Sequence, residues 1–586
     1  MCGILVIHSK KNKLNLEKCR SSFRQLDHRG PDYSYDIYFS DENLYLGQTV
    51  LSITGSPDKE LKKFHQSFSG RFEVIFNGEI YNFQKLKNEF LKNIDLATKT
   101  DTEVLVNLNE RLSPNQLFNE ISGMYAYICY DKQEKSLFVG RDIIGEKCIY
   151  KYEDDDVMIL SSEIRPIVDY TGTINVNNQK LYEYFFTRHL LIQSETPINA
   201  IEILAPGVLK SYCLRSKKWQ TQEIRNLSSL IDLDILEANK SRSEDDLLEE
   251  LDSLFSKNAN ELMPSVPYGS VFSGGIDSSL ASIFMLKTDN HPDLYCLRFG
   301  KKDPIIDHIP LFEKRISKRI QILNVTEELF TDQLKKSYKF SLSPIATHSF
   351  VSQQILSEQV KKNGQKVLIG GDGADELFGG YEAYKEVITG NEALSNPSPY
   401  SGFVDNGITF KDFDLSNFIS FKKEEWEKAK NMFQSESGRD LNIHAALYLD
   451  TFLQLESVGL RASDLMSMVN SVESRGFFVT HDVMSFAINL PANRKIDIDA
   501  SDPRFVTKPL LKKLFVKYFG ENLLFPKQGF SGFPNESARS ILGQQYLNYM
   551  SQLQPTVDII DTDISQSLEW KIMNVELFLR SRSNNL

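Results

Sequence analysis

The hydrophobic pattern of the chain changes near residue 225, and this change constrains the fold more than any other feature. Before about residue 215, aromatic and branched residues form short runs bounded by Gly, Asn and Asp, which is typical of strands. The predicted strands are 44–46, 71–76, 124–130 and 136–140, and helical patterns lie near 16–26 and 102–108. Short strands with few long helices predict an α+β sandwich of sheets with helices on its outer faces.

Strands and helices alternate beyond a polar segment at 217–243. Ser243 begins a capping box, so a new helix starts there. The predicted strands are 268–272, 293–299, 319–325 and 366–369, with helices at 278–287 and 351–361. This alternation indicates an α/β doubly wound parallel sheet. Residues 386–440 are expected to form a loop-rich insertion, and the patterns from about 440 onward indicate a helical C-terminal part.

These patterns divide the 586 residues into two expected domains, 2–215 and 240–586, with the boundary near residue 225. The 67 Lys and Arg against 79 Asp and Glu give a net charge of −12. A chain this acidic is a poor general nucleic-acid binder, because phosphate binding needs a cationic surface. No run approaches the ~18 apolar residues of a membrane span, and the N-terminus lacks the features of a signal peptide. The six cysteines lie far apart without a CxxC pair, which favours a reducing compartment, and we expect a cytoplasmic protein.

Cys2 stands directly after the initiator Met and becomes the first residue if that Met is removed. Its α-amino group, with an ordinary pKa of about 7.7–8.0, could then act as the general base for its own thiol. One residue would supply both nucleophile and base, as an N-terminal Thr does in some hydrolases. The alternative is an ordinary cysteine at a chain end.

Four further motifs follow Cys2 in order: HRGPD at 28–32, NGEIYN at 77–82, TDTEV at 100–104 and GRDIIG at 140–145. Together with Cys2 they resemble the glutamine amidotransferase domain of the N-terminal-nucleophile (class II) family over roughly residues 2–210. The resemblance implies a sandwich of the N-terminal-nucleophile type that hydrolyses glutamine.

The resemblance also implies a role for each matching residue. Cys2 would attack the side-chain amide of glutamine. Asn77 and the backbone N–H of Gly78 would form the oxyanion hole, where each donor contributes ~2.7–4 kcal/mol. Glu79 and Asp101 would hold the α-amino group of glutamine. The predicted glutamine-binding residues are Ile53, Asn77, Gly78, Glu79 and Asp101. A hairpin turn is the structural alternative for the Asn-Gly pair.

One position departs from the family pattern. The family usually carries an Arg before its Leu-Ser-Ile block, where it pairs with the glutamine carboxylate, and this chain has Val50 there. Either another cation takes over, with Lys99 and Arg71 as candidates, or glutamine binds weakly and free ammonia is the better nitrogen source.

A glycine-rich segment at 273–279, SGGIDSS, follows a predicted strand and begins a helix. Glycines let the backbone approach a phosphate, and N–H groups at a helix N-terminus favour an anion. The hydroxyls of Ser273 and Ser278 add donors, and Asp277 can hold Mg²⁺. The GxxxxGK[ST] pattern is absent, which argues against a P-loop kinase or GTPase.

A second glycine-rich segment at 370–381, GGDGADELFGGY, follows the predicted strand 366–369. Doubly wound sheets bind ligands at the carboxyl ends of their strands. Asp375 fits a second Mg²⁺ ligand. Asp372 is a candidate to take a proton from attacking ammonia. A solvated acidic turn is the alternative.

The first segment resembles the signature of ATP pyrophosphatases, which split ATP into AMP and pyrophosphate. The second segment, with 461–475 and 526–530, resembles the synthetase domain of asparagine synthetases. The resemblance implies that ATP and Mg²⁺ are used, that Lys527 meets the acyl-adenylate and its leaving phosphate, and that Phe299 contacts the adenine. The predicted ATP-binding residues are Phe272, Ser273, Gly274, Gly275, Asp277, Ser278, Phe299, Gly370 and Gly371.

Two departures concern this second half. The family usually has a basic residue before Met-Ser-Met, where this chain has Leu465, and it commonly has Pro-Phe-Leu-Asp where this chain has Phe-Phe-Val-Thr at 477–480. The second change either alters packing alone or reshapes the pocket for the acceptor.

The resemblance implies an asparagine synthetase-type reaction. Glutamine is hydrolysed at Cys2, ammonia passes inside the protein, and it attacks aspartate activated by Mg-ATP as a β-aspartyl-adenylate. Glutamine and aspartate are then the substrates, and relatives are often homodimers. Four alternatives remain: an uronic acid of a sugar as acceptor, β-lactam ring closure, a non-catalytic protein on a synthetase scaffold, and a tRNA-modifying ATP pyrophosphatase. Cys2 argues against the second, and the acidic charge and the amidotransferase motifs argue against the last.

Overall fold

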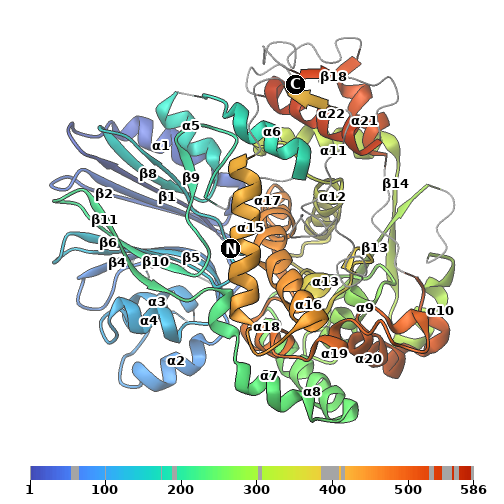
Figure 1. The fold of residues 1–586 in the computed structure, drawn as a ribbon. Helices are drawn as coiled ribbons and strands as arrows, with labels where there is room; N and C mark the ends of the chain where they lie inside the picture. The colour runs from blue at the N-terminus through green and yellow to red at the C-terminus, as the bar shows by residue number, and fades with distance from the viewer. Residues whose placement is uncertain are drawn as a thin grey trace.

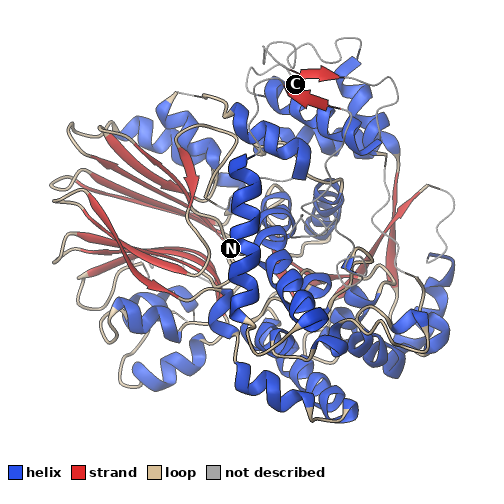
Figure 2. Cartoon of the chain, in the orientation of Figure 1, coloured by secondary structure: helices blue, strands red, loops and turns tan. Residues whose placement is uncertain are grey.

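The protein has two parts, a sheet sandwich and a parallel sheet surrounded by helices, which lie side by side in Figure 1 and Figure 2. The structure is a computed structural model, and it describes residues 2–54, 65–98, 100–172, 174–187, 194–300, 306–384, 408–410, 416–526, 533–543, 557–559 and 566–581.

Two antiparallel sheets form the sandwich. The first has the order β2-β3-β1-β8-β7-β9, with the bounds β1 Cys2–Ser9, β2 Tyr33–Phe39, β3 Leu44–Val50, β7 Tyr150–Glu153, β8 Val157–Ser161 and β9 Ile201–Ile203. The second has the order β11-β10-β6-β5-β4, with the bounds β4 Phe72–Ile80, β5 Gly123–Asp131, β6 Ser136–Arg141, β10 Val208–Cys213 and β11 Lys218–Ile224. Val6, Leu46 and Ile128 are among the apolar residues buried between the sheets.

Helices cover both outer faces of the sandwich (Figure 1). Those on the first sheet are α1 Leu16–Arg24, α5 Ile164–Thr171 and α6 Asn178–Thr187. Those on the second are α2 Phe83–Phe90, α3 Asp101–Leu108 and α4 Pro114–Glu120. The predicted α+β sandwich with outer helices is therefore confirmed.

A five-stranded, all-parallel sheet forms the centre of the second part. Its order is β14-β13-β12-β15-β17, with the bounds β12 Tyr268–Val271, β13 Asp293–Phe299, β14 Ile320–Val325, β15 Val367–Gly370 and β17 Glu473–Gly476. The helices before and between these strands are α8 Glu244–Leu262, α9 Ile276–Met285, α10 Ile309–Ile316, α11 Glu327–Phe340, α12 Ser349–Lys362 and α13 Ala374–Phe378. The predicted doubly wound sheet is confirmed. Its strand order reverses between β12 and β15, which is where such sheets bind ligands.

The C-terminal part is mostly helical, as expected. Its helices are α15 Ser416–Met432, α16 Gly438–Leu449, the π-helix η5 Asp450–Leu460, α17 Arg461–Met468, α18 His481–Ile488, α19 Ala492–Lys495, α20 Pro509–Phe519, α21 Pro534–Leu542 and α22 Gln566–Ser581. A two-stranded sheet pairs β16 Ile408–Phe410 with β18 Val557–Ile559. None of the described helices is long and apolar enough to cross a membrane.

Three segments differ from the predictions. Residues 416–432 form α15, so the loop-rich interpretation of 386–440 is wrong there, and 386–407 and 411–415 lie outside the described residues. The polar segment 217–243 contains β11, an edge strand of the sandwich, and helix α7 Leu233–Lys240. A polar strand, β17, lies within the region expected to be helical.

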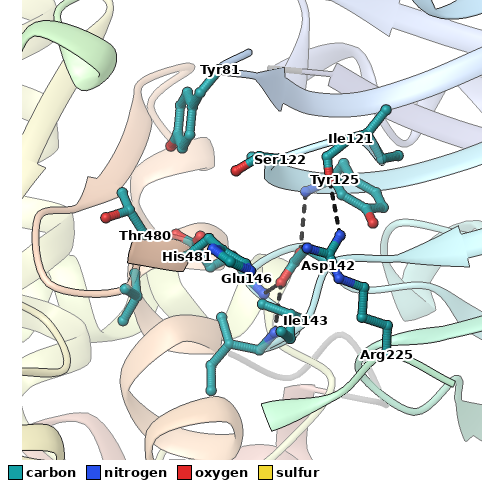
Figure 3. Close-up of a pocket in the computed structure, with 13 residues that line it drawn as sticks. Tyr81, Ile121, Ser122, Tyr125, Asp142, Ile143, Glu146, Arg225, Thr480 and His481 are labelled. Atoms are coloured by element: carbon teal, nitrogen blue, oxygen red, sulfur yellow. Dashed lines mark hydrogen bonds between the residues drawn. The ribbon is translucent and has the colours of Figure 1, made fainter. Parts of the chain in front are cut away.

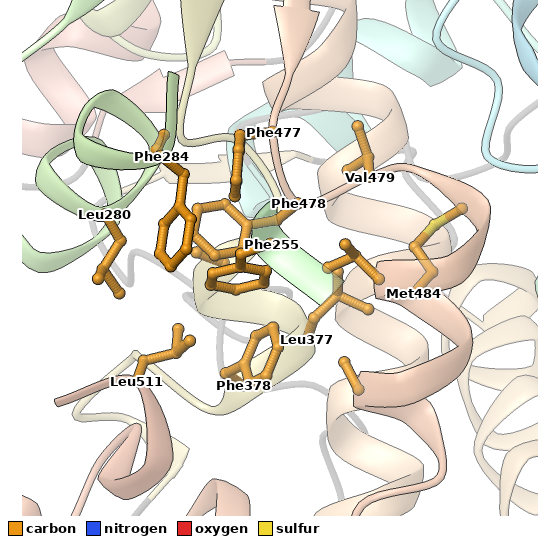
Figure 4. Packing of buried hydrophobic residues seen from close by; sticks show 14 of the residues in the cluster. Phe255, Leu280, Phe284, Leu377, Phe378, Phe477, Phe478, Val479, Met484 and Leu511 are labelled. Atoms are coloured by element: carbon orange, nitrogen blue, oxygen red, sulfur yellow. The ribbon is translucent and has the colours of Figure 1, made fainter. Parts of the chain in front are cut away.

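A core of packed aromatic side chains joins several segments of the second part (Figure 4). The ring of Phe255 on α8 lies 5.4 Å from that of Phe284, 5.2 Å from Phe477 and 5.4 Å from Phe478. The same apolar cluster includes Leu51 from the sandwich, so the two parts share a core. The segment that departs from the family pattern at 477–480 is therefore built into this core.

Candidate active sites

Cys2 begins β1 and lies between the two sheets of the sandwich. Its side chain is 5% exposed. Its backbone N–H donates to Asn77 Oδ1 at 3.0 Å, and Gln48 Nε2 donates to its Sγ at 3.2 Å. Burial raises the pKa of the Cys2 thiol. The thiol is thus held in a fixed position and needs a base to become a nucleophile.

Asn77 and Gly78 lie inside β4, so the hairpin alternative is wrong. Asn77 Nδ2 is buried and has no hydrogen-bond partner among the described residues. Gly78 has a φ of 144°, and a Cβ there would lie 2.0 Å from the carbonyl oxygen of Met124. Only glycine fits that position. An unused donor beside Cys2 is what an oxyanion hole requires.

Two carboxyl groups lie near this pair. Asp101 begins α3 and accepts from the backbone N–H of Ile80 at 3.1 Å. Glu79 accepts from the hydroxyl of Thr54 and lies 3.4 Å from Arg475 Nη2. Burial, and then repulsion by Asp101, raises the pKa of Glu79, and burial raises the pKa of Asp101. The structure brings four of the five predicted glutamine-binding residues together.

The fifth, Ile53, directly precedes Thr54, whose hydroxyl donates to Glu79, so its backbone lies next to this group. Its side chain packs into the core shared by the two parts, and its carbonyl accepts from the hydroxyl of Ser265 at 2.6 Å. Arg71 cannot replace the missing Arg at position 50, because it pairs with Asp131 at the far end of β4, about 20 Å along the strand from Asn77. Lys99 lies outside the described residues.

The loop after β12 has the form of an anion-binding turn. Gly274 has a φ of 77°, and Gly275 is the N-cap of α9. The hydroxyls of Ser273 and Ser278 lie 2.8 Å apart, and the backbone N–H of Ser273 donates to Ser278 Oγ at 3.0 Å. The loop therefore leads into the N-terminus of α9, where backbone N–H groups would stabilise a phosphate.

The loop after β15 packs against this first loop. A Cβ at Gly371 would lie 3.1 Å from the Cβ of Asp277, so the close approach depends on glycine. Asp372 Oδ2 accepts from Ser463 Oγ on α17 at 3.1 Å. Burial raises the pKa of Asp372 to about 6. A carboxylate with this pKa is suited to act as a base near neutral pH. Gly370 ends β15 beside these groups.

The two predicted Mg²⁺ ligands converge on one cation. Asp277 Oδ1 and Asp375 Oδ1 each lie 2.6 Å from the ammonium of Lys508, which is buried before α20. A Cβ at Gly380 would overlap both Asp375 and Lys508. The described residues contain no group of three or more potential metal ligands. Two carboxylates nevertheless fit Mg²⁺, which commonly takes one or two together with substrate phosphates.

Lys508 was not predicted, because nothing in its sequence neighbourhood distinguishes it from an exposed lysine. Of the predicted ATP-binding residues, Phe272 has its ring in the core, 5.3 Å from that of Phe312, so only its backbone can face the loop. Phe299 ends β13 and contacts Phe330 and Phe533. Lys527 lies outside the described residues.

A chain of buried contacts joins the two sites. Arg29 Nε donates to the carbonyl of Cys2 at 3.0 Å, and its Nη2 donates to Asp464 Oδ2 at 2.8 Å. The preceding residue, Ser463, contacts Asp372. The candidate nucleophile of the first part is therefore connected to the candidate base of the second.

A small cavity also lies between the two parts (Figure 3). Its lining includes Tyr81, Asp142, Glu146, Val479 and Thr480.

Two family models match the chain. The model described as "Glutamine amidotransferase domain" matches residues 1–223, and that described as "Asparagine synthase" matches residues 250–567.

Curated relatives extend over most of the chain. Asparagine synthetase [glutamine-hydrolyzing] 1 of Bacillus subtilis is 24% identical and covers 91% of this chain and 87% of its own length. Amidase chry2 of Gibberella zeae is 22% identical and covers 88% and 86%. Asparagine synthetase B of Escherichia coli is 26% identical and covers 65% of each. Among solved structures, glutamine phosphoribosylpyrophosphate amidotransferase from B. subtilis matches with a TM-score of 0.30 and 15% identity, covering 63% of this chain and 82% of that one.

Proposed function

The chain belongs to the asparagine synthase family, with a glutamine amidotransferase domain before the synthase domain, and we propose that it forms an amide from an ATP-activated carboxylate and glutamine-derived ammonia. It is a carbon–nitrogen ligase with glutamine as amide donor. The observation that carries the proposal is the presence of both assembled sites in one molecule, joined through Arg29.

The first step uses the sandwich. With the initiator Met removed, the α-amino group of Cys2 takes the thiol proton, and the sulfur attacks the side-chain amide of glutamine. Asn77 Nδ2 and the N–H of Gly78 stabilise the negative oxygen of the tetrahedral intermediate. The α-ammonium group of Cys2 returns the proton to the amide nitrogen, which leaves as ammonia, and water then releases glutamate from the thioester. Asp101 and Glu79 provide negative charge for the α-amino group of the substrate.

The second step uses the parallel sheet. The loop at 273–278 binds the pyrophosphate of ATP through its N–H groups and hydroxyls. Asp277 and Asp375 would hold Mg²⁺, which supplies charge neutralisation on the phosphates when bound. A carboxylate oxygen of the acceptor attacks the α-phosphorus, and pyrophosphate leaves.

The third step joins the products of the first two. Ammonia attacks the acyl carbon of the adenylate, Asp372 takes a proton from the attacking nitrogen, and AMP leaves as the amide forms. The Ser463 hydroxyl positions the Asp372 carboxylate for this role.

We propose aspartate as the acceptor. The B. subtilis relative named as an asparagine synthetase covers most of both chains and supports this choice. Another carboxylate, such as an uronic acid of a sugar, is the second candidate. It is favoured by the similar coverage of the relative named amidase chry2 and by Thr480 in place of the usual Asp.

Acceptor-dependent release of pyrophosphate from Mg-ATP tests the proposal. Aspartate, glucuronate and galacturonate are offered separately, each with glutamine and then with ammonium chloride. Release of pyrophosphate and AMP with aspartate, and not without it, is the expected result. Release of pyrophosphate with an uronate but not with aspartate would show that the uronate is the acceptor. Release of ADP in place of AMP would show that the reaction does not form an adenylate.

A further inference from the structure

The cavity between the two parts contains a carboxyl group that the proposed mechanism does not use. Glu146 lies on the loop after β6 and is only 6% exposed, yet it lines the cavity (Figure 3). Among the described residues its carboxylate makes no hydrogen bond and no ion pair, and only its backbone N–H is engaged, with Asp142 Oδ1 at 2.9 Å. An unpaired buried carboxylate is costly, so this site favours a cation or a proton.

The charged groups around Glu146 are already committed to other partners. Asp142 accepts from several backbone N–H groups, including those of Tyr125 and Lys147. The Lys147 ammonium forms its ion pair with Asp464 at 3.1 Å, and its charge partly offsets the effect of burial on the pKa of Glu146. Arg225 at the rim donates to backbone carbonyls of the first part. No described cation is therefore paired with the Glu146 carboxylate.

The remaining titratable groups make the site more negative. Asp372 and Glu473 act on Glu146 from the second part. His481 and Tyr81 also line the cavity, and His481 Nδ1 contacts its neighbour Asp482. Burial, followed by repulsion from Asp142, raises the pKa of Glu146 well above its ordinary value.

The position of the cavity relates it to the synthetase site. One wall is Val479, and a Cβ at Gly373, the residue after Asp372, would lie 2.6 Å from Val479 Cγ1. Val479 and Thr480 are both positions at which this chain departs from the family pattern. Val479 thus lies between the cavity and the loop that carries the candidate base Asp372.

A cavity lined by the carboxyl groups of Glu146 and Asp142 and by the ring of Tyr81 suits a small monovalent cation, whose charge favours the ionised form of Glu146. We propose that ammonium from solution enters the synthetase site through this cavity, with Glu146 as the group that binds it and takes its proton. The ammonium nitrogen keeps the electron pair of the broken N–H bond and becomes ammonia, and the carboxylate becomes a carboxylic acid that returns the proton to solvent. This inference rests on the proposed function and is consistent with Val50, which leaves the glutamine carboxylate without its usual partner.

The kinetic test compares Glu146→Gln with Glu249→Gln, a matched change on the exposed face of α8. In acceptor-dependent pyrophosphate release, Glu146→Gln is expected to lower kcat/KM for ammonium by about 10- to 100-fold, because a charge-assisted contact is lost. The rate with glutamine stays within about twofold of the wild-type rate, and Glu249→Gln behaves as wild type. An equal fall with both nitrogen sources, or no fall with ammonium, would overturn the proposal.

A binding test separates this inference from the proposed function. Thallium(I), an ammonium-sized cation, is soaked into crystals of the full chain, and its anomalous signal is located. The expected signal lies beside Glu146 in the wild type and is absent in Glu146→Gln. Its absence from the wild-type cavity overturns the inference even if amide synthesis is observed. A wild type that binds thallium at Glu146 but releases no pyrophosphate keeps the cation site and rejects the function.

Discussion

Cys2 and Asn77 come from different sheets and are 75 residues apart in sequence, yet their contact defines the first site. At the residue scale, Asn77 is important because its side-chain amide nitrogen, Nδ2, remains available as a donor. Oδ1 is used by Cys2, whereas Nδ2 is buried without a described partner. A donor left without a partner in the folded protein gains most when a substrate oxygen becomes negative beside it.

Replacement of Asn77 by Ala tests this role. The account predicts a fall of about 10²- to 10³-fold in the glutamine-dependent rate, because one oxyanion donor is lost. The ammonium-dependent rate is expected to be unchanged. Asn109→Ala is the control, since Asn109 is also buried but binds the carbonyl of Leu105 within the same domain. Equal losses with glutamine and ammonium would indicate a structural role for Asn77.

The buried carboxyl group of Asp372 is expected to make the stability of the folded protein depend on pH. Its pKa is raised from 3.8 in the unfolded chain to about 6 by burial, so the folded state binds more protons between these values. Stability therefore falls as the pH rises from about 4 to 6, and above that range the charged group costs about 2–3 kcal/mol.

Asp372→Asn removes this cost. We expect the variant to unfold at a higher urea concentration than the wild type at pH 8 and to lose this advantage at pH 4. It should also lose acceptor-dependent pyrophosphate release. Urea titrations at the two pH values provide the measurement, and an advantage that grows toward pH 4 would contradict the account.

The contacts of the Lys508 ammonium with two carboxylates lead to a prediction about how Mg²⁺ affects stability. Lys508→Met leaves Asp277 and Asp375 facing each other, and because both remain partly exposed we expect a loss of about 1–3 kcal/mol without the metal. Addition of Mg²⁺ should recover more stability in the variant than in the wild type, since the metal can take the place of the ammonium. Thermal unfolding with EDTA and with Mg²⁺ measures both. Equal gains in the two proteins would show that the carboxylates do not bind Mg²⁺.

At the element scale, the sequence predicted the strands whose buried faces are apolar. The predicted strand 293–299 has the bounds of β13, and the bounds of the other predicted strands of the parallel sheet differ from the observed ones by at most one residue at each end. It did not predict β17, because Glu473 and Arg475 are polar and are buried through an ion pair with each other. Short polar strands of this kind depend on partners that a sequence pattern does not reveal.

The same limit applies to the sites. The motifs located the loops after β12 and β15, because glycine-rich turns between a strand and a helix are visible in sequence. Lys508 and Glu146 were missed, since their significance arises only when distant segments meet. The assignment of Ile53 to the glutamine pocket stays a prediction for its backbone, since its side chain belongs to the shared core and its neighbour Thr54 contacts Glu79.

Replacement of Phe255 tests how much the aromatic core around helix α8 contributes to stability. Its ring is fully buried among Phe284, Phe477 and Phe478. Phe255→Ala is expected to lower the free energy of unfolding by about 3–5 kcal/mol, because it removes a large apolar side chain and leaves a cavity. Phe68→Ala serves as the control, since Phe68 is 56% exposed, and it should change stability by less than about 0.5 kcal/mol. Denaturant unfolding measures the free energy of unfolding of both variants. Similar losses of stability in the two variants would contradict the packing argument.

At the scale of the whole molecule, the two parts share one interface that connects the two candidate sites. They share an apolar core that includes Leu51 and Phe255, and Arg29 links Cys2 to Asp464 across the interface. Such buried, charge-assisted contacts are specific in geometry, so they hold the two sites in a fixed relation. We therefore propose that hydrolysis of glutamine and activation of the acceptor are parts of one reaction.

Transfer of label from [amide-¹⁵N]glutamine tests this central claim most directly. The full chain is incubated with Mg-ATP, aspartate and the labelled glutamine, and the amide product and AMP are quantified together. The account predicts ¹⁵N in a newly formed side-chain amide, with one AMP for each labelled amide. Label found only in free ammonium, without AMP, would contradict it.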